Sequence, residues 1–153
     1  MKKLLVIVAL LGLTYSCSNS TSEKKESSTN DQAAPADAPS SPEGVGKFKH
    51  VDLAATLDKK MADDGKGIYE MKCAGCHKLT GEKLVGPGWK GVTVRRKPEW
   101  IMNFVTNTEE MLNKDTSAQA MLEICMVKMP NQNLTDEAAR KVLEFMRQND
   151  GIK

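Results

Sequence analysis

Two cysteines and a histidine stand close together in the run Cys73-Ala74-Gly75-Cys76-His77. Thiols separated by two residues can form thioether bonds to the vinyl groups of one porphyrin, and the imidazole that follows can bind its iron as the proximal ligand. Cysteines at this spacing also occur in thiol oxidoreductases and in half of a zinc site. The histidine directly after the second cysteine favours covalent attachment of a c-type haem over both alternatives.

The start of the chain has the pattern of an export signal. Lys2 and Lys3 precede an apolar run, residues 4–13, that is too short to span a bilayer and has the length of a signal-peptide core. The next residues, 14–17, resemble a loose bacterial lipobox that ends in Cys17, although Tyr15 departs from the small residues usual there. We therefore expect residues 1–16 to be removed and Cys17 to carry lipid. Simple secretion with cleavage nearby is the alternative.

Residues 17–46 are predicted to be a disordered tether. They are rich in Ser, Thr, Ala, Pro, Lys and Glu, and such a composition cannot bury enough apolar surface to offset the entropy of ordering. A flexible chain of this length reaches about 30 Å on average and roughly 100 Å when taut. It would let an anchored domain move between partners, or would serve only as a spacer.

The charge balance gives no sign of a nucleic-acid-binding protein. The formal net charge of +2 equals the charge of the two lysines in the predicted signal peptide. The remaining chain therefore has no basic excess of the kind that binds nucleic acid.

The rest of the chain, residues 47–153, is long enough for one domain and has a helical pattern. A first helix is expected to start at Asp63 or Asp64 and to lead to Cys73. A second helix is expected from Pro98 to about Asn107. Strand-like alternation is confined to a few residues around Val92–Val94.

The second half of the domain predicts two or three more helices. One or two short helices are expected over residues 109–112 and 117–124, and the clearest helix follows the cap Thr135 and closes before Gly151. Their apolar positions are expected to face the core: Met111, Leu112, Met121, Leu122 and Ile124 in the short helices, and Ala138, Ala139, Val142, Leu143, Phe145 and Met146 in the last.

From about Asp63 to Asn149 the chain resembles the class I cytochrome c family. Gly65 and Tyr69 precede the haem motif at the spacing with which the family's first helix crosses its last, where Phe145 would be the aromatic partner. The resemblance implies an all-α fold, a bundle of about four to five helices around one covalently bound haem c.

The resemblance also implies the iron ligands. His77 would be the proximal ligand, and the carbonyl of Pro87, in Gly86-Pro87, would accept a hydrogen bond from it. Met129, followed by a proline, would be the axial methionine. Met126 is close enough to compete for this role, whereas Met111 and Met121 fit core positions.

Two further residues fall where the family binds a haem propionate. Gly91 and Arg95 follow the Gly-Pro pair at the family's offsets, and by this resemblance Arg95 would bind the propionate. Trp100 would donate its indole N–H to the same propionate. The alternatives are a solvated arginine and a core tryptophan. Cys125 has no evident partner and is expected to be a buried, inert thiol, with a redox-sensitive role as the alternative. His50 is expected on the surface.

Together these features predict a one-electron carrier rather than an enzyme. Two protein ligands would leave no open iron position for a substrate, so single electrons would pass through the porphyrin edge. The partners would be a redox donor and acceptor in a respiratory chain, such as a terminal oxidase or a nitrogen-oxide reductase. We expect a monomer on the periplasmic side of a bacterial membrane, held there by its lipid. The alternatives are a haem-free thiol oxidoreductase or zinc module, and a haem-based gas sensor with a displaceable Met129.

Overall fold

The computed structural model describes residues 41–153. The predicted signal peptide, Cys17 and most of the predicted tether lie outside the described residues. The described part has six helices and no β-strand: α1 (Lys59–Lys72), α2 (Val92–Arg95), α3 (Pro98–Thr106), α4 (Thr108–Lys114), α5 (Thr116–Cys125) and α6 (Asp136–Asn149). The all-α prediction is confirmed. Within residues 41–153, no helix combines the length and the apolar character needed to cross a membrane.

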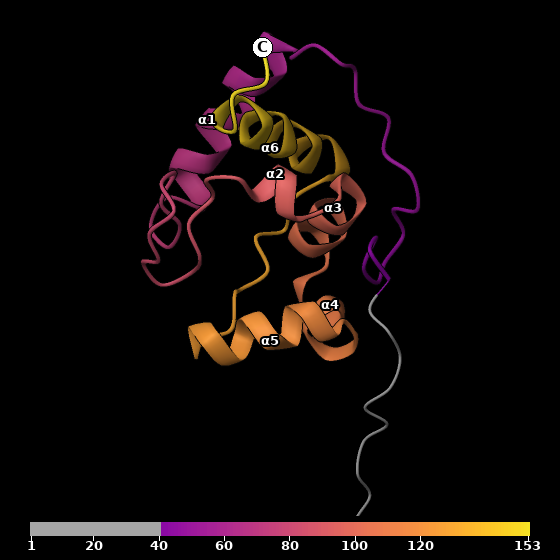
Figure 1. Ribbon diagram of the computed structural model, residues 1–153, viewed down its shortest axis with the longest axis vertical. Coiled ribbons are helices and arrows are strands. Elements are labelled where there is room, and N and C mark those ends of the chain that lie inside the picture. The colour runs from indigo at the N-terminus through magenta and orange to yellow at the C-terminus, as the bar shows by residue number, and fades with distance from the viewer. Residues whose placement is uncertain (1–40) are drawn as a thin grey trace, which may run out of the picture. The chain divides into compact units, whose positions relative to one another are not determined.

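Helices α1 and α6 cross at one end of the domain, α4 and α5 lie at the other end, and α3 lies between them (Figure 1). A Cβ atom on Gly65 would lie 2.0 Å from the carbonyl oxygen of Lys141, so only a glycine allows α1 to approach α6 this closely. Next to this contact the rings of Tyr69 and Phe145 pack with their centroids 5.4 Å apart. The predicted crossing of the first and last helices is confirmed.

The predicted start of α1 at Asp63 or Asp64 is wrong, because the helix begins four residues before Asp63. Asp58 is the cap, and its carboxylate accepts a hydrogen bond from the third backbone N–H beyond it at 2.9 Å. Asp64 lies inside the helix and pairs with Lys60 and Lys141 at 3.3 and 3.4 Å. An acidic residue can therefore sit within α1 without capping it, because lysines one turn back and on α6 neutralise its charge.

Helices α3 to α6 follow the sequence pattern closely. The predicted bounds of α3 are confirmed, and α6 is capped by Thr135 as predicted. The short helices α4 and α5 are separate because Asp115 ends α4 and caps α5. Ile124 is 68% exposed in the last turn of α5, so its predicted inward orientation is wrong.

The residues around Val92–Val94 form the single turn α2 instead of a strand. The carboxylate of Asp150, just after α6, accepts hydrogen bonds from the backbone N–H groups of Gly91 and Thr93 at 2.5 and 2.8 Å and so holds this turn. The additional turn raises the helix number above the predicted four to five.

Residues 43–57, which we call the N-terminal strap, run without regular secondary structure along the helices (Figure 1). Asn103 of α3 is only 1% exposed, and its amide donates to the carbonyls of Glu43 and Phe48 at 3.0 and 2.9 Å. The backbone N–H of Val51 donates to the buried Glu99 at 2.9 Å. The folded part therefore begins before residue 47, where the domain was predicted to start, because buried side chains hold the backbone of the strap.

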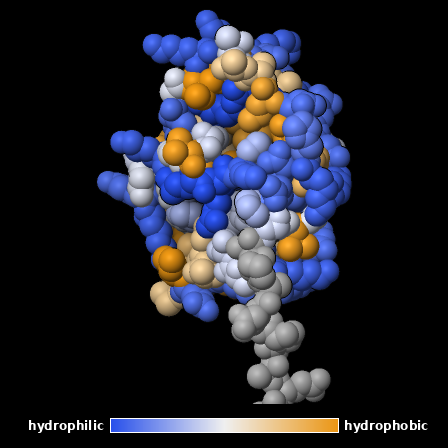
Figure 2. Space-filling view, turned by 45° about the vertical axis from the view of Figure 1, so that its right-hand side comes forward, coloured by the Kyte–Doolittle hydropathy of each residue, from blue (hydrophilic) through white to orange (hydrophobic). Residues whose placement is uncertain are grey.

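The described residues pack around one core between α1, α3, α4 and α6. Its aromatic members are Tyr69, Trp89, Trp100 and Phe145, and aliphatic side chains such as Met111, Leu143 and Met146 pack around them. The face of the molecule shown in Figure 2 is largely hydrophilic, and apolar residues are exposed on it in separate places.

Candidate functional site

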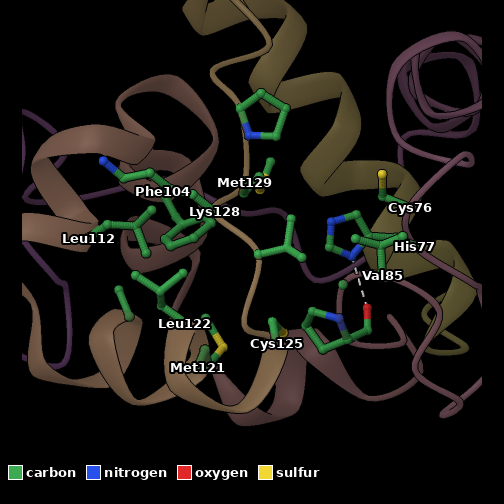
Figure 3. Close-up of a pocket in the computed structure, with 15 residues that line it drawn as sticks. Cys76, His77, Val85, Phe104, Leu112, Met121, Leu122, Cys125, Lys128 and Met129 are labelled. Carbon is green, nitrogen blue, oxygen red and sulfur yellow. Dashed lines mark hydrogen bonds between the residues drawn. The ribbon is translucent and has the colours of Figure 1, made fainter.

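Two adjoining cavities lie between the segment after α1 and the helices α3 and α5. They enclose about 580 and 990 Å³ of space, counting the part open to solvent. Five residues line both cavities, so the two form one continuous site: His77, Pro87, Phe104, Met121 and Met129. Figure 3 shows how side chains from distant parts of the chain meet there.

His77 is fixed in one orientation at the wall of this site. Its Nδ1 lies 2.9 Å from the carbonyl oxygen of Pro87, as predicted. A carbonyl can only accept, so Nδ1 carries the proton and donates, which leaves the lone pair on Nε2 for a metal. A Cβ on Gly86 would lie 2.3 Å from the ring, so glycine is required there to make room for the imidazole.

The two motif cysteines lie in a tight turn at the end of α1. The backbone N–H groups of Cys76 and His77 both donate to the carbonyl of Cys73, at 3.0 and 2.9 Å. Cys76 is exposed and lines the smaller cavity, whereas Cys73 is 6% exposed and lines neither cavity. Burial raises the pKa of the Cys73 thiol to about 11.

The two haem-free alternatives find no support in this arrangement. The attacking cysteine of a thiol oxidoreductase is accessible and has a lowered pKa, whereas Cys73 is 6% exposed and burial raises its pKa, so Cys73 does not suit that role. A zinc site needs about four ligands, but no cluster of three or more His, Cys, Asp or Glu side chains that could hold a metal occurs within residues 41–153. His50 is on the surface, as predicted, where it contacts Asp52 at 2.7 Å.

Of the two methionines that compete from the sequence, only Met129 reaches the site. Met126 is 83% exposed and lines neither cavity. It is the C-cap of α5 with a φ of 58°, a left-handed conformation that turns the chain out of the helix. The turn brings Met129, three residues later, to the wall of both cavities (Figure 3). Met111 is fully buried in the core, as predicted.

Sequence reasoning missed that α5 forms one wall of the site. Met121, which was expected in the core, lines both cavities, so it is a second thioether facing the same space as that of Met129. Its neighbours on the cavity wall are Ala118, Leu122 and Cys125. These four residues follow the spacing of one helix face, a signal that was already present in the sequence. Cys125 is therefore half-buried at the cavity, whereas a fully buried thiol was expected.

The indole N–H of Trp100 has a buried protein partner, which favours the alternative of a core tryptophan over the predicted propionate donor. Its indole N–H donates to the carboxylate of Asp115 at 3.2 Å, and both residues are buried. The same carboxylate oxygen accepts from Ala118 N at 2.8 Å as the cap of α5. The indole N–H therefore ties α3 to α5, although the ring still lines the larger cavity.

Arg95 lines the larger cavity, as its predicted contact with a propionate requires. Its guanidinium donates to the carbonyls of Lys90 and Gly88 at 2.5 and 3.3 Å, which holds the side chain near this wall. Contact with an anionic group remains a prediction.

The residues present fit an iron porphyrin. The wall of the smaller cavity is almost entirely apolar, as a flat hydrophobic macrocycle requires. An oriented imidazole and a thioether line it, and an arginine lies on the wall of the adjoining cavity.

Comparison with known proteins gives a consistent result. The family model described as cytochrome c matches residues 62–150, whereas the search of curated proteins finds no match. Among solved structures, the chain is similar to the cytochrome c from Rhodothermus marinus, with a TM-score of 0.66 and 31% identity over 69% of this chain and 90% of that chain. It is also similar to an engineered form, Rma TDE, with a TM-score of 0.68 and 30% identity over 72% and 98%. The same engineered form bound to a carbene intermediate gives a TM-score of 0.65.

Proposed function

Because the chain belongs to the cytochrome c family, it is a haem-based electron carrier with a covalently attached haem c, and we propose that His77 and Met129 are the two axial ligands of the iron. The observation that carries the proposal is that both side chains line both adjoining cavities, with Nε2 of the imidazole free to bind a metal. When bound, the haem supplies an iron that alternates between the ferric and ferrous states.

The protein groups around this site would hold the iron and tune it. Cys73 and Cys76 would form the thioether bonds, and the hydrogen bond to Pro87 keeps His77 in the tautomer that binds through Nε2. The thioether of Met129 is a soft donor that stabilises the ferrous state and so raises the reduction potential. Two protein ligands leave no iron position for a substrate, which supports electron transfer over catalysis.

Replacement of Met129 tests the ligand assignment. In Met129→Ala we expect the haem to stay attached, the weak ferric sulfur-to-iron absorption band to disappear, and the reduction potential to fall by on the order of 0.1 V, a fraction of the roughly 0.8 V range that axial ligands control. Absorption spectra and potentiometric titration measure these changes.

Two matched variants make this test specific. Met126→Ala removes an exposed thioether three residues away and should leave both the band and the potential unchanged. Met121→Leu removes the other thioether at the site. If the band were lost in this variant and kept in Met129→Ala, the ligand would be Met121. Rapid binding of carbon monoxide to the ferrous parent would favour the gas-sensor alternative.

We propose that redox partners dock on an exposed apolar rim beside the cavity. The rim comprises Leu84, Val85, Ile124, Met126 and Val127, five of the large apolar side chains exposed in the described part. Lys83 joins its two segments by donating to the carbonyl of Ile124 at 2.8 Å, and residues of both segments line the smaller cavity. Exposed apolar surface of this kind is typical of interaction sites.

The charges beside the rim favour an acidic partner. Lys83 and Lys128 border the rim, and no carboxylate lies within ion-pair distance of either among residues 41–153. The basic run at residues 95–97 is less suited to docking, because its side chains already have partners within the domain. Arg95 binds backbone carbonyls, Arg96 lies over the ring of Trp100 at 4.5 Å, and Lys97 pairs with Glu43 at 2.6 Å.

We further propose that the protein works at the periplasmic side of a bacterial membrane, anchored by lipid on Cys17, between a donor and an acceptor of a respiratory chain such as a terminal oxidase or a nitrogen-oxide reductase. The support is the signal-like start of the chain and the polar segment that follows it. Cys17→Ser should move the haem protein from the membrane to the soluble fraction. An unchanged distribution would contradict lipid anchoring.

A further inference from the structure

We propose that Lys72 and Lys83 are positioning residues that hold the loop carrying Met129 against the site and so determine how readily the thioether leaves the iron. We call residues 126–134, between α5 and α6, the Met129 loop. The inference rests on the proposed function, because it takes Met129 as an axial ligand.

Apart from the apolar packing of Leu134 against the core, the Met129 loop has few other connections to the domain. No backbone N–H or carbonyl of residues 127–134 forms a backbone–backbone hydrogen bond with any described residue. Two hydrogen bonds stay within the loop, from the Gln132 amide to the carbonyl of Pro130 and from the backbone N–H of Asn133 to Asn131. These local bonds shape the loop but do not attach it to the helices.

The two lysines supply connections from the opposite wall of the site. Lys72 is the last residue of α1, directly before Cys73, and its ammonium donates to the carbonyl of Gln132 at 3.2 Å. Lys83 forms an isolated β-bridge with His77, and its ammonium donates to the carbonyl of Ile124 at 2.8 Å. Lys72 therefore holds the loop itself after Met129, whereas Lys83 holds the end of α5, from which the loop starts. Both come from the segment that carries the proximal histidine.

This arrangement links the two ligand-bearing segments around the cavity. For Met129 to leave, its sulfur–iron bond must break, with no change in the oxidation state of the iron, and the loop must move away from the wall. Movement of the loop breaks the hydrogen bond of Lys72, and movement of the end of α5 with the loop breaks that of Lys83. Loss of one hydrogen bond of ordinary net strength shifts the equilibrium between the closed and the open loop by about two- to ten-fold. The two bonds reach different carbonyls, so we expect their effects to multiply.

Ligand exchange with imidazole measures loop opening directly. Imidazole is mixed with the full-length, haem-loaded ferric protein, and the rate of ligand exchange is measured by absorption. The imidazole concentration is raised until this rate no longer depends on it. This limiting rate reports departure of the protein ligand. We expect about a three-fold increase in Lys72→Gln and in Lys83→Gln, and about a ten-fold increase in the double variant.

Two matched variants separate positioning from a general effect of charge or stability. Lys59→Gln makes the same charge change on the same helix at a lysine with no ion pair to a described residue, and it should keep the parental rate. Lys72→Arg retains a charged donor and should restore the rate to near the parental value. In the absence of imidazole, all of these variants should keep the sulfur-to-iron band.

The outcomes distinguish this inference from the ligand assignment on which it rests. A parental limiting rate in the double variant, with the sulfur-to-iron band intact, would overturn the role of the lysines and leave Met129 as the ligand. A parent protein without this band, or one that shares its spectrum with Met129→Ala, would overturn the ligand assignment and the inference with it.

Discussion

Glu144 is a fully buried carboxylate on α6 that connects three parts of the domain. It accepts hydrogen bonds from Arg140 at 2.6 Å, from Arg147 at 2.7 Å, and from the backbone N–H of Asp58, the cap of α1, at 3.0 Å. Arg147 also donates to the carbonyl of Ala54 in the N-terminal strap at 2.6 Å. Burial acts to raise the pKa of Glu144, but the hydrogen bonds from Arg140, Asp58 and Arg147 outweigh it, and the pKa is lowered.

Glu144→Gln should destabilise the protein in a pH-dependent way. Removing one partner of a buried ion pair leaves the arginines without their charge partner, and this costs about 3 kcal/mol at neutral pH. A lowered folded-state pKa stabilises the protein above the ordinary value of 4.5, and this contribution is lost as the pH falls through the folded-state value. The difference from the parent should therefore be largest near pH 7 and shrink below pH 4.5.

Thermal unfolding of both proteins at neutral and acidic pH checks this expectation. Glu123→Gln, at an exposed position of α5, is the matched control and should unfold like the parent at every pH. A difference between Glu144→Gln and the parent that stayed constant with pH would show that the carboxylate contributes through shape alone.

At the scale of elements, the crossing of α1 and α6 depends on the absence of one side chain. Any Cβ at position 65 would lie 2.0 Å from the carbonyl oxygen of Lys141, and a backbone atom of a helix cannot move aside as a flexible side chain can. The helices would have to separate, which would disturb the packing of Tyr69 against Phe145.

Gly65→Ala is expected to lower the free energy of unfolding by about 3 kcal/mol, at the upper end of the cost of overpacking a core. Gly67→Ala is a matched control in the same helix, because nothing lies within 4 Å of its Cβ. Alanine favours helix by up to about 1 kcal/mol over glycine, so this variant should be more stable than the parent. Urea unfolding measures both, and equal effects of the two substitutions would refute the close-contact explanation.

At the scale of the whole molecule, the apolar rim and its lysines present one face to a partner. Ile124 and Met126 are exposed although they are large and apolar, and neither is needed to fill the core. Lys128 borders them without an ion-pair partner among residues 41–153. An apolar contact would set the strength of docking, and the positive charge would steer an acidic partner.

We expect Ile124→Thr with Met126→Gln to slow electron exchange with respiratory membranes several-fold. Lys128→Gln should slow exchange at low ionic strength only, because salt screens exposed charges beyond about 10 Å at 0.1 M. Val94→Thr, at an apolar residue of α2 that is exposed but outside the rim, should have no effect. Stopped-flow measurement of the rate of haem oxidation by the membranes, at two salt concentrations, tests these expectations. Equal slowing by the rim variant and by Val94→Thr would place the docking surface elsewhere.

The sequence alone was sufficient to predict haem attachment at Cys73, Cys76 and His77, because attachment needs a fixed spacing within one turn of chain. The same holds for α3 and α6, whose caps and apolar stripes lie within the helices themselves. The preference for Met129 over Met126 could be stated from the sequence as a resemblance only.

The tertiary structure decided which groups meet across the chain. It placed Met126 in solvent and Met121 at the cavity, directed the indole N–H of Trp100 to Asp115, and extended the folded part into the N-terminal strap. Each of these outcomes depends on a partner many residues away that satisfies a polar group or occupies a space. Local patterns specify the elements and the reactive groups, whereas packing selects among the polar and apolar contacts that several residues could make equally well.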